Sequence, residues 1–240
     1  RKGMIIDIDQ LKRECADFGV EIDSLAAERF NSYARILIEW NEKMNLTAIT
    51  EPSAVVTRHF ADSLTFLSAV KPQENARLID VGSGAGFPGL ALKIARPDMD
   101  ITLLDGTNKR ITFLNAAANE LGVEINAMHA RAEEAAIKPE LREKYDFAVA
   151  RAVAAMNLLS EYCLGFVKVG GKFIAMKGPS AEDELKSAQN AIKIMGGKSA
   201  GATSLTLADG SERCILTVEK IAHTPTGYPR VSAKIAKKPL

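Results

Sequence analysis

The stretch Asp80-Val81-Gly82-Ser83-Gly84-Ala85-Gly86-Phe87-Pro88-Gly89 decides the fold of this 240-residue chain. It continues the short apolar run Leu78-Ile79 and leads into a helical pattern that extends to about Ala95. Glycines at such a strand-to-helix turn permit positive φ angles and let a ligand approach the backbone without a Cβ in the way. We therefore expect a ligand to bind at this turn.

Two ligands fit the glycine pattern. Starting at Gly84, G-x-G-x-x-G matches the dinucleotide-binding pattern, and Asp105 follows at roughly the 20-residue spacing that would let it bind a ribose. Starting at Asp80, D-x-G-x-G-x-G matches the loop that wraps the amino-acid end of S-adenosylmethionine. An acid at the end of the strand opposes a pyrophosphate but suits the ammonium and sulfonium groups of that cofactor. The pattern favours S-adenosylmethionine, and NAD remains the alternative.

Strand and helix patterns alternate from Arg77 onward. Strands are expected at 78–81, 101–104, 125–129, 145–150 and 172–177, with helices at 88–95, 111–121, 133–137 and 155–166. This alternation is typical of a parallel sheet covered by helices on both faces. Two further strands, at 204–207 and 213–218, flank Asp209-Gly210, which is a strong hairpin signal. The sequence thus predicts an α/β fold whose mostly parallel sheet ends in an antiparallel hairpin, an ending that the all-parallel dinucleotide-binding sheet lacks.

The chain divides into three predicted parts. Residues 1–75 carry three amphipathic helix patterns and are expected to form an N-terminal helical extension. Residues 76–222 are expected to form the cofactor-binding domain. Residues 223–240 form a tail that is basic and has no acidic residue.

Composition excludes several classes of protein. The chain has 31 Lys and Arg against 30 Asp and Glu, so charge alone does not draw it to nucleic acid or to a membrane surface. No apolar run reaches the roughly 18–20 residues that a membrane span requires. The three cysteines lie far apart and lack metal-binding spacing. We expect a cytoplasmic monomer that contacts no membrane and holds no metal.

Several motifs, together with the glycine loop, resemble those of one known family. They are Trp40–Thr47, Arg58–Ser63, Leu103–Leu114, Ala132-Glu133 and Ala150-Arg151-Ala152. They occur in the same order along nearly the whole chain and resemble the bacterial glucose-inhibited division protein B family. Members of that family methylate nitrogen 7 of a guanine in small-subunit (16S) ribosomal RNA. The resemblance implies a Rossmann-like class I S-adenosylmethionine-dependent methyltransferase, with this RNA or the 30S subunit as its partner.

The resemblance also implies a set of cofactor contacts. Added to Asp80 and Gly84 from the loop pattern, they are Gly82, Phe87, Asp105, Gly106, Thr107, Ala132, Glu133 and Arg151. Gly106 departs from the family, which more often has Ser or Ala there. Arg151 is also notable in its own right, because it ends an apolar run at the carboxyl end of a strand, where ligands bind in open α/β sheets.

A second set of residues is expected to hold the substrate base. It comprises Asn45, Arg58, His59, Arg151 and Lys177. Nitrogen 7 of guanine has a lone pair and no proton to lose, so methyl transfer to it needs no general base and depends on positioning. The motifs expected for methylation of exocyclic amino groups or of pyrimidine carbon 5 are absent after the fourth strand. For Arg58 and His59 the alternative is an ordinary surface ion pair.

RNA phosphates have two candidate partners, Lys109-Arg110 and the basic tail, and such contacts weaken as salt increases. Cutting the chain at His223 is therefore expected to weaken RNA modification and leave cofactor affinity unchanged. Two other functions stay open from the residues alone. They are an NAD-dependent oxidoreductase and a catalytically silent RNA-binding protein.

Overall fold

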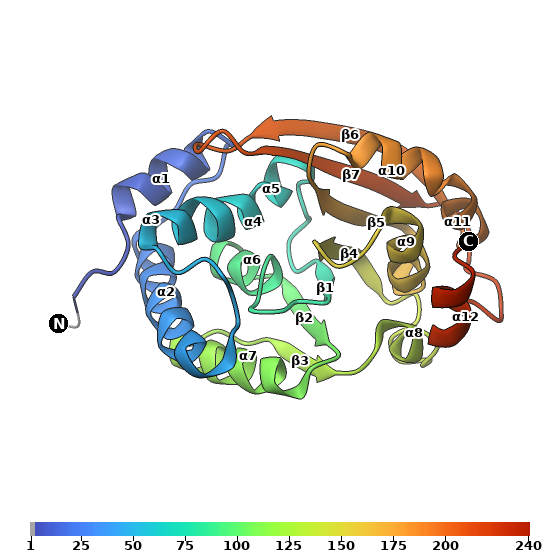
Figure 1. The fold of residues 1–240 in the computed structure, drawn as a ribbon, viewed down its shortest axis with the longest axis horizontal. Helices are drawn as coiled ribbons and strands as arrows, with labels where there is room; N and C mark the ends of the chain where they lie inside the picture. The colour runs from blue at the N-terminus through green and yellow to red at the C-terminus, as the bar shows by residue number, and fades with distance from the viewer. Residues whose placement is uncertain (1–2) are drawn as a thin grey trace.

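The computed structural model describes residues 3–240, in which a seven-stranded sheet lies between layers of helices (Figure 1). The strands are β1 (Arg77–Val81), β2 (Asp100–Asp105), β3 (Asn126–His129), β4 (Tyr145–Arg151), β5 (Val167–Lys177), β6 (Gly197–Thr206) and β7 (Glu212–Lys220). Their order is β3-β2-β1-β4-β5-β7-β6. Strands β1 to β5 are parallel, and β7 is antiparallel to both β5 and β6. The predicted mostly parallel sheet with a terminal hairpin is confirmed.

The helices that follow the strands cover both faces of the sheet. They are α6 (Gly89–Ala95), α7 (Asn108–Leu121), α8 (Ala132–Ala135), α9 (Met156–Leu164), α10 (Ala181–Ser187) and α11 (Gln189–Ile194). Helices α6 and α7 pack on β2 and β3, whereas α9, α10 and α11 pack on β4 to β7. The sequence pattern predicts neither α10 and α11 nor residues 197–203 of β6. Helix α10 buries only Ala181, and β6 is a mostly exposed edge strand, so their apolar periodicity is weak.

The N-terminal helices lie on the same side of the sheet as α6 and α7, and part of this layer packs directly on the strands. They are α1 (Ile8–Ala16), α2 (Ser24–Met44), α3 (Pro52–Val55), the π-helical turn η1 (Val56–Ala61), α4 (Asp62–Leu64) and α5 (Phe66–Ala69). Phe30, Tyr33 and Phe60 of this layer are fully buried in one hydrophobic cluster with Leu90 and Phe113 of the sheet's own helices. The N-terminal layer therefore shares its core with this face of the sheet (Figure 1).

Local signals explain where these N-terminal helices begin and end. The Asp23 carboxylate accepts a hydrogen bond from Ala26 N at 2.7 Å and caps α2. Asn45 ends α2 in the left-handed conformation, with φ of 49°. The π-helical turn that follows α3 is of a kind frequent at functional sites. It carries Arg58 and His59 to the carboxyl end of β4.

The C-terminal tail folds back onto the molecule. Its helix α12 (Ser232–Lys237) lies beside α8 and α9, and Ile235 is fully buried (Figure 1). The tail is thus a docked segment of the fold.

Candidate active site

Three cavities meet along the carboxyl ends of β2, β1, β4 and β5. The α8 cavity, about 270 Å³, is lined by residues that include Gly106, Ala132, Glu133, Tyr162 and Ser232. The loop cavity, about 360 Å³, is lined by residues that include Leu46, Gly84, Phe87 and Arg110. The arginine cavity, about 500 Å³, is lined by residues that include Arg58, Asp62, Lys177 and Arg213.

Shared residues join the three cavities into one crevice. Gly82, Asp105 and Val153 border both the α8 cavity and the loop cavity. His59 and Arg151, with Ala152, border both the loop cavity and the arginine cavity. A ligand at the glycine loop and a ligand in the arginine cavity would therefore be neighbours, separated by the His59 and Arg151 side chains.

Most of the predicted cofactor residues line this crevice. Those that line the α8 cavity or the loop cavity are Gly82, Gly84, Phe87, Asp105, Gly106, Ala132, Glu133 and Arg151. Thr107 is exposed and lines none of the three cavities, but its backbone N–H donates to Asp105 Oδ1 at 2.9 Å. The sheet thus brings together positions from four segments of the chain that the sequence separates by up to 69 residues.

Asp105 and Gly82 shape the wall between the α8 and loop cavities. Asp105 is 3% exposed, and its Oδ2 accepts from Gly84 N at 2.9 Å, which holds the glycine loop against the end of β2. Gly82 has φ of +76°, and a Cβ at this position would lie 2.8 Å from Val153 Cγ2. Both the conformation and the lack of space require glycine at this position.

Asp80, which was predicted to contact the cofactor, does not face the crevice. Its side chain is fully buried under the glycine loop, and Oδ2 accepts from Gly89 N at 2.8 Å. Its Oδ1 is buried and has no hydrogen-bond partner within residues 3–240. Burial raises the pKa of Asp80 to about 7, although the Gly89 N–H and the Arg151 charge oppose the rise. The loop crosses in front of the strand end, so Asp80 fixes the start of α6 from behind the cavity wall.

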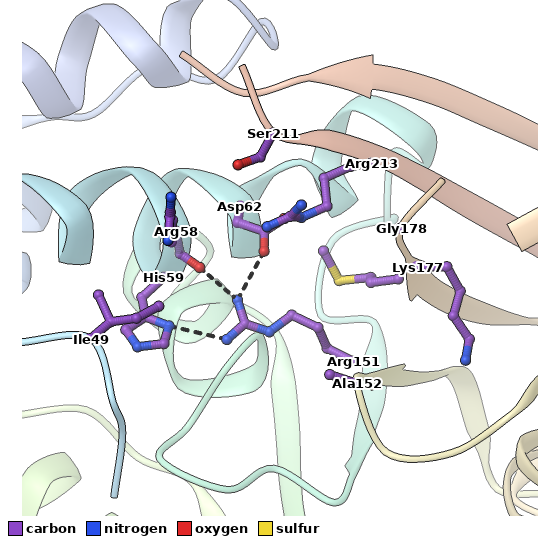
Figure 2. A pocket seen from close by; sticks show the side chains of 11 residues that line it. Ile49, Arg58, His59, Asp62, Arg151, Ala152, Lys177, Gly178, Ser211 and Arg213 are labelled. Atoms are coloured by element: carbon purple, nitrogen blue, oxygen red, sulfur yellow. Dashed lines mark hydrogen bonds and ion pairs between the residues drawn. The ribbon is translucent and has the colours of Figure 1, made fainter. Parts of the chain in front are cut away.

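Arg151 is the centre of the arginine cavity (Figure 2). Its guanidinium donates to the Arg58 carbonyl oxygen at 3.1 Å and to Asp62 Oδ2 at 3.2 Å. It also donates to His59 Nδ1 at 3.1 Å, and its Cζ lies 5.3 Å from the centre of the Phe87 ring. An arginine with this many partners is held in one orientation.

His59 is a neutral ring with both nitrogens engaged. The ring stacks on Phe87 at 4.2 Å between centroids, with an interplanar angle of 3°. Because Nδ1 accepts from Arg151, the ring proton is assigned to Nε2, which lies 2.8 Å from Thr47 Oγ1. Burial and the Arg151 charge lower the pKa of His59 to about 3. His59 is therefore suited to hold Arg151 and Phe87 in place rather than to take up a proton.

Asp62 and Arg213 complete the cavity and were missing from the predicted site. The Asp62 carboxylate is buried and bridges two arginines, with Oδ2 on Arg151 and Oδ1 on Arg213 Nε, each at 3.2 Å. The spacing of Arg58, His59 and Asp62 already indicates contacts within that helical run. Arg213 has no such local signal, because it reaches Asp62 only through the pairing of β7 with β5.

Three predicted substrate residues are placed differently from Arg151 and His59. Arg58 is at the cavity rim, where its Nε lies 2.7 Å from Asp209 Oδ2. Lys177 lines the arginine cavity, but its ammonium pairs with Glu184 at 2.8 Å and points away from Arg151 (Figure 2). Asn45 is exposed at the end of α2 and does not line the three cavities, although Leu46 does. A substrate role for these three remains a prediction.

Within the part of the chain that the structure describes, no helix combines the length and hydrophobicity needed to cross a bilayer. The same residues contain no group of three or more His, Cys, Asp or Glu side chains that could hold a metal ion.

Residues 26–212 match the protein family described as GidB, rRNA small subunit methyltransferase G. The chain belongs to this family. A family member from Alkaliphilus metalliredigens is 48% identical over 96% of this chain and 97% of its own length. Another, from Clostridium perfringens strain 13, is 45% identical over 97% of this chain and 98% of its own length. Both are named ribosomal RNA small subunit methyltransferase G. Neither the oxidoreductase nor the silent RNA-binding protein is supported.

Solved structures confirm the Rossmann-like methyltransferase fold of this family member. TrmN from Thermus thermophilus matches with a TM-score of 0.52 at 17% identity, over 69% of this chain and 53% of that one. M. jannaschii TYW2 in complex with AdoMet matches with a TM-score of 0.51 at 14% identity, over 64% of this chain and 73% of that one. At such low identity the likeness concerns the fold alone.

Proposed function

We propose that this chain transfers a methyl group from S-adenosylmethionine to nitrogen 7 of a guanine in small-subunit ribosomal RNA. The observation that carries the proposal is the continuity of the crevice across Arg151 and His59. The α8 and loop cavities would hold the cofactor, and the arginine cavity would hold the base. A ribosomal RNA substrate also fits the predicted cytoplasmic location. That the chain acts as a monomer stays a prediction.

The residues of the α8 and loop cavities fit S-adenosylmethionine. Gly82 and Gly84 have positive φ and present backbone in place of side chains, which leaves room for the amino-acid end. The Asp105 and Glu133 carboxylates border the α8 cavity and can accept hydrogen bonds from hydroxyl and amino groups. When bound, the cofactor supplies a methyl group on a positively charged sulfur.

The arginine cavity fits a guanine edge. Guanine presents its O6 and N7 as acceptors on one side, and arginine is a common donor to that edge. Arg213 borders this cavity and is 26% exposed, so it can donate to O6 while N7 keeps its lone pair. Since N7 has no proton to lose, the engaged state of His59 is compatible with the reaction. The protein's task is therefore to hold the base in position for methyl transfer.

Cations at the rim of the crevice suit RNA phosphates. Arg58 lies at the arginine cavity with 51% of its side chain exposed, and Arg110 lies at the loop cavity with 46% exposed. Contacts of this kind fix the register of the RNA without selecting a sequence. Their contribution should fall as the salt concentration rises.

The test is transfer of tritiated methyl groups from S-adenosylmethionine to unmodified 30S subunits and, separately, to their naked RNA. Labelled RNA is then mapped by strand scission specific for 7-methylguanosine. We expect one cleavage at one site, and the better substrate identifies what is recognised. Label without scission would contradict transfer to N7. No label, despite normal cofactor binding, would contradict the proposed substrate.

A further inference from the structure

The C-terminal tail, residues 223–240, supplies part of the wall of the α8 cavity. Ser232 lines this cavity together with Glu133 and Tyr162. Its hydroxyl donates to Glu133 Oε1, and Arg131 Nη1 donates to Ser232 Oγ at 3.2 Å. Ser232 therefore connects a cation and an anion at the start of α8.

Buried contacts fix the tail in this position. The Arg230 guanidinium binds both oxygens of the Glu161 carboxylate at 2.9 and 2.8 Å, and the Arg230 N–H also donates to Glu161 at 2.9 Å. Glu161 on α9 is only 1% exposed. Arg142 donates to the Tyr228 and Thr224 carbonyl oxygens at 2.7 and 2.9 Å. A bidentate pair with a buried carboxylate is a strong and directional contact.

The Glu133 carboxylate is left with one oxygen for a ligand. Ser232 donates to Oε1, and no residue between 3 and 240 donates to Oε2. Glu133 is 8% exposed, so its charge is largely removed from water and favours a further donor. The exocyclic amino group of adenine is such a donor. The keto oxygen that replaces it in hypoxanthine is an acceptor, which a carboxylate repels.

We propose that Ser232, held by the Arg230–Glu161 pair, positions Glu133 to bind the adenine amino group of the cofactor. The tail is then a cofactor-binding element, and its exposed lysines remain free to contact RNA. This inference rests on the proposed function, because it takes S-adenosylmethionine as the cofactor. It also reverses the sequence-based expectation for a cut at His223. Such a cut removes both Ser232 and Arg230, and cofactor affinity should fall.

The test compares S-adenosylhomocysteine with S-inosylhomocysteine, in which a keto oxygen replaces the amino group and N1 carries a proton. Their dissociation constants are measured by calorimetry for the intact protein and for Ser232→Ala, Ser232→Thr and Arg230→Met. Ser187→Ala, an exposed serine on α10, is the matched control. Thermal unfolding of each variant reports whether it is folded.

We expect the unchanged protein to prefer S-adenosylhomocysteine by about tenfold or more, the size of effect set by one hydrogen bond to a charged group. Ser232→Ala and Arg230→Met should lose most of this preference, mainly by weaker binding of the adenosyl ligand. Ser232→Thr, which keeps the hydroxyl, and Ser187→Ala should retain it.

Three results would overturn the inference. One is an unchanged preference in Ser232→Ala. Another is an equal loss of both ligands in that variant, which would show a loosened pocket without recognition of the amino group. The third is failure of the unchanged protein to bind either ligand. That last result overturns the proposed function itself, before any variant is compared.

Discussion

The loop cavity and the arginine cavity of the crevice are built in different ways. The loop cavity depends largely on backbone, with the glycines between Asp80 and Gly89 held against β2 by Asp105. The arginine cavity depends on side chains that come from separate elements, namely His59 on η1, Arg151 on β4 and Arg213 on β7. The glycine loop at the centre of the first is one continuous stretch of sequence, whereas the side chains of the second come together only when the whole sheet has assembled.

The loop cavity and the arginine cavity should therefore respond differently to substitution. A change in the glycine loop alters the shape of a backbone surface, so it should act on cofactor binding. A change in the arginine cavity alters the orientation of a few charged groups, so it should act on methyl transfer. Substitutions that change cofactor binding and spare methyl transfer, or the reverse, would support this division of tasks, and substitutions that change both would contradict it.

The largest effect is expected for Gly82→Ala. The new Cβ would lie 2.8 Å from Val153 Cγ2 at a residue with φ of +76°, so strain and a displaced cavity wall add together. Affinity for S-adenosylhomocysteine, measured by calorimetry, should fall by about tenfold to a hundredfold. The control is Gly210→Ala in the β6–β7 hairpin, where φ is +86° but a Cβ meets nothing within 4 Å. Equal affinities in the two variants would refute the role of the close approach.

Asp62→Asn should have the next largest effect. It leaves Arg151 and Arg213 without their shared countercharge, and removing one partner of a buried ion pair commonly costs about 3 kcal/mol of folding free energy. Chemical unfolding should show a loss of that order, together with slower methyl transfer. Asp209→Asn, which frees the more exposed Arg58, is the matched change and should cost less than about 1 kcal/mol. Similar losses in both variants would contradict the bridging role of Asp62.

His59 should make stability depend on pH. Its folded pKa, about 3, is below the unfolded value of 6.5, so the unfolded chain binds the extra proton first as the pH falls. The contribution of neutral His59 is fully present above pH 6.5 and is lost progressively toward pH 3. His59→Asn should therefore flatten the decline in unfolding free energy across this window. Asp80, with a raised pKa of about 7, acts in the opposite direction, so wild type and variant must be compared at each pH. Parallel curves would show that His59 does not titrate in this way.

The smallest effect is expected for Arg58→Met at the rim. Loss of one phosphate contact should lower the salt dependence of RNA binding by about one unit in the log–log slope. Filter binding at several salt concentrations measures this slope. An unchanged slope would leave Arg58 as a partner of Asp209 alone.

The sequence predicted those features that depend on neighbouring residues. The glycine loop, the Asp105 turn, the parallel strands and the Asp209-Gly210 hairpin each have a local pattern, and the structure confirms each of them. Most of the cofactor residues that the family resemblance implies line the crevice, and their contact with the cofactor stays a prediction. Asp80 was predicted to contact the cofactor, but its side chain is buried under the loop and binds Gly89 N, which a linear pattern does not show.

What could not be predicted depends on contacts between distant residues. Arg213 reaches Asp62 across 151 positions, and Ser232 reaches Glu133 across 99. Neither residue stands out in its own neighbourhood, because the tail resembles a solvated basic segment and β7 an ordinary strand. Only the assembled fold assigns them to the crevice.

Cofactor binding and base positioning are thus separate tasks, the first at the α8 and loop cavities and the second at the arginine cavity. Arg213→Met tests this separation, because Arg213 lines the arginine cavity and neither of the other two. Affinity for S-adenosylhomocysteine and single-turnover methyl transfer to unmodified 30S subunits are measured on the same preparation. The control is Arg77→Met, which removes an exposed ion pair with Asp100 at the opposite end of the sheet. We predict unchanged cofactor affinity and methyl transfer about tenfold slower for Arg213→Met, the cost of one lost charged hydrogen bond. A parallel fall in both, or unchanged transfer, would contradict this separation.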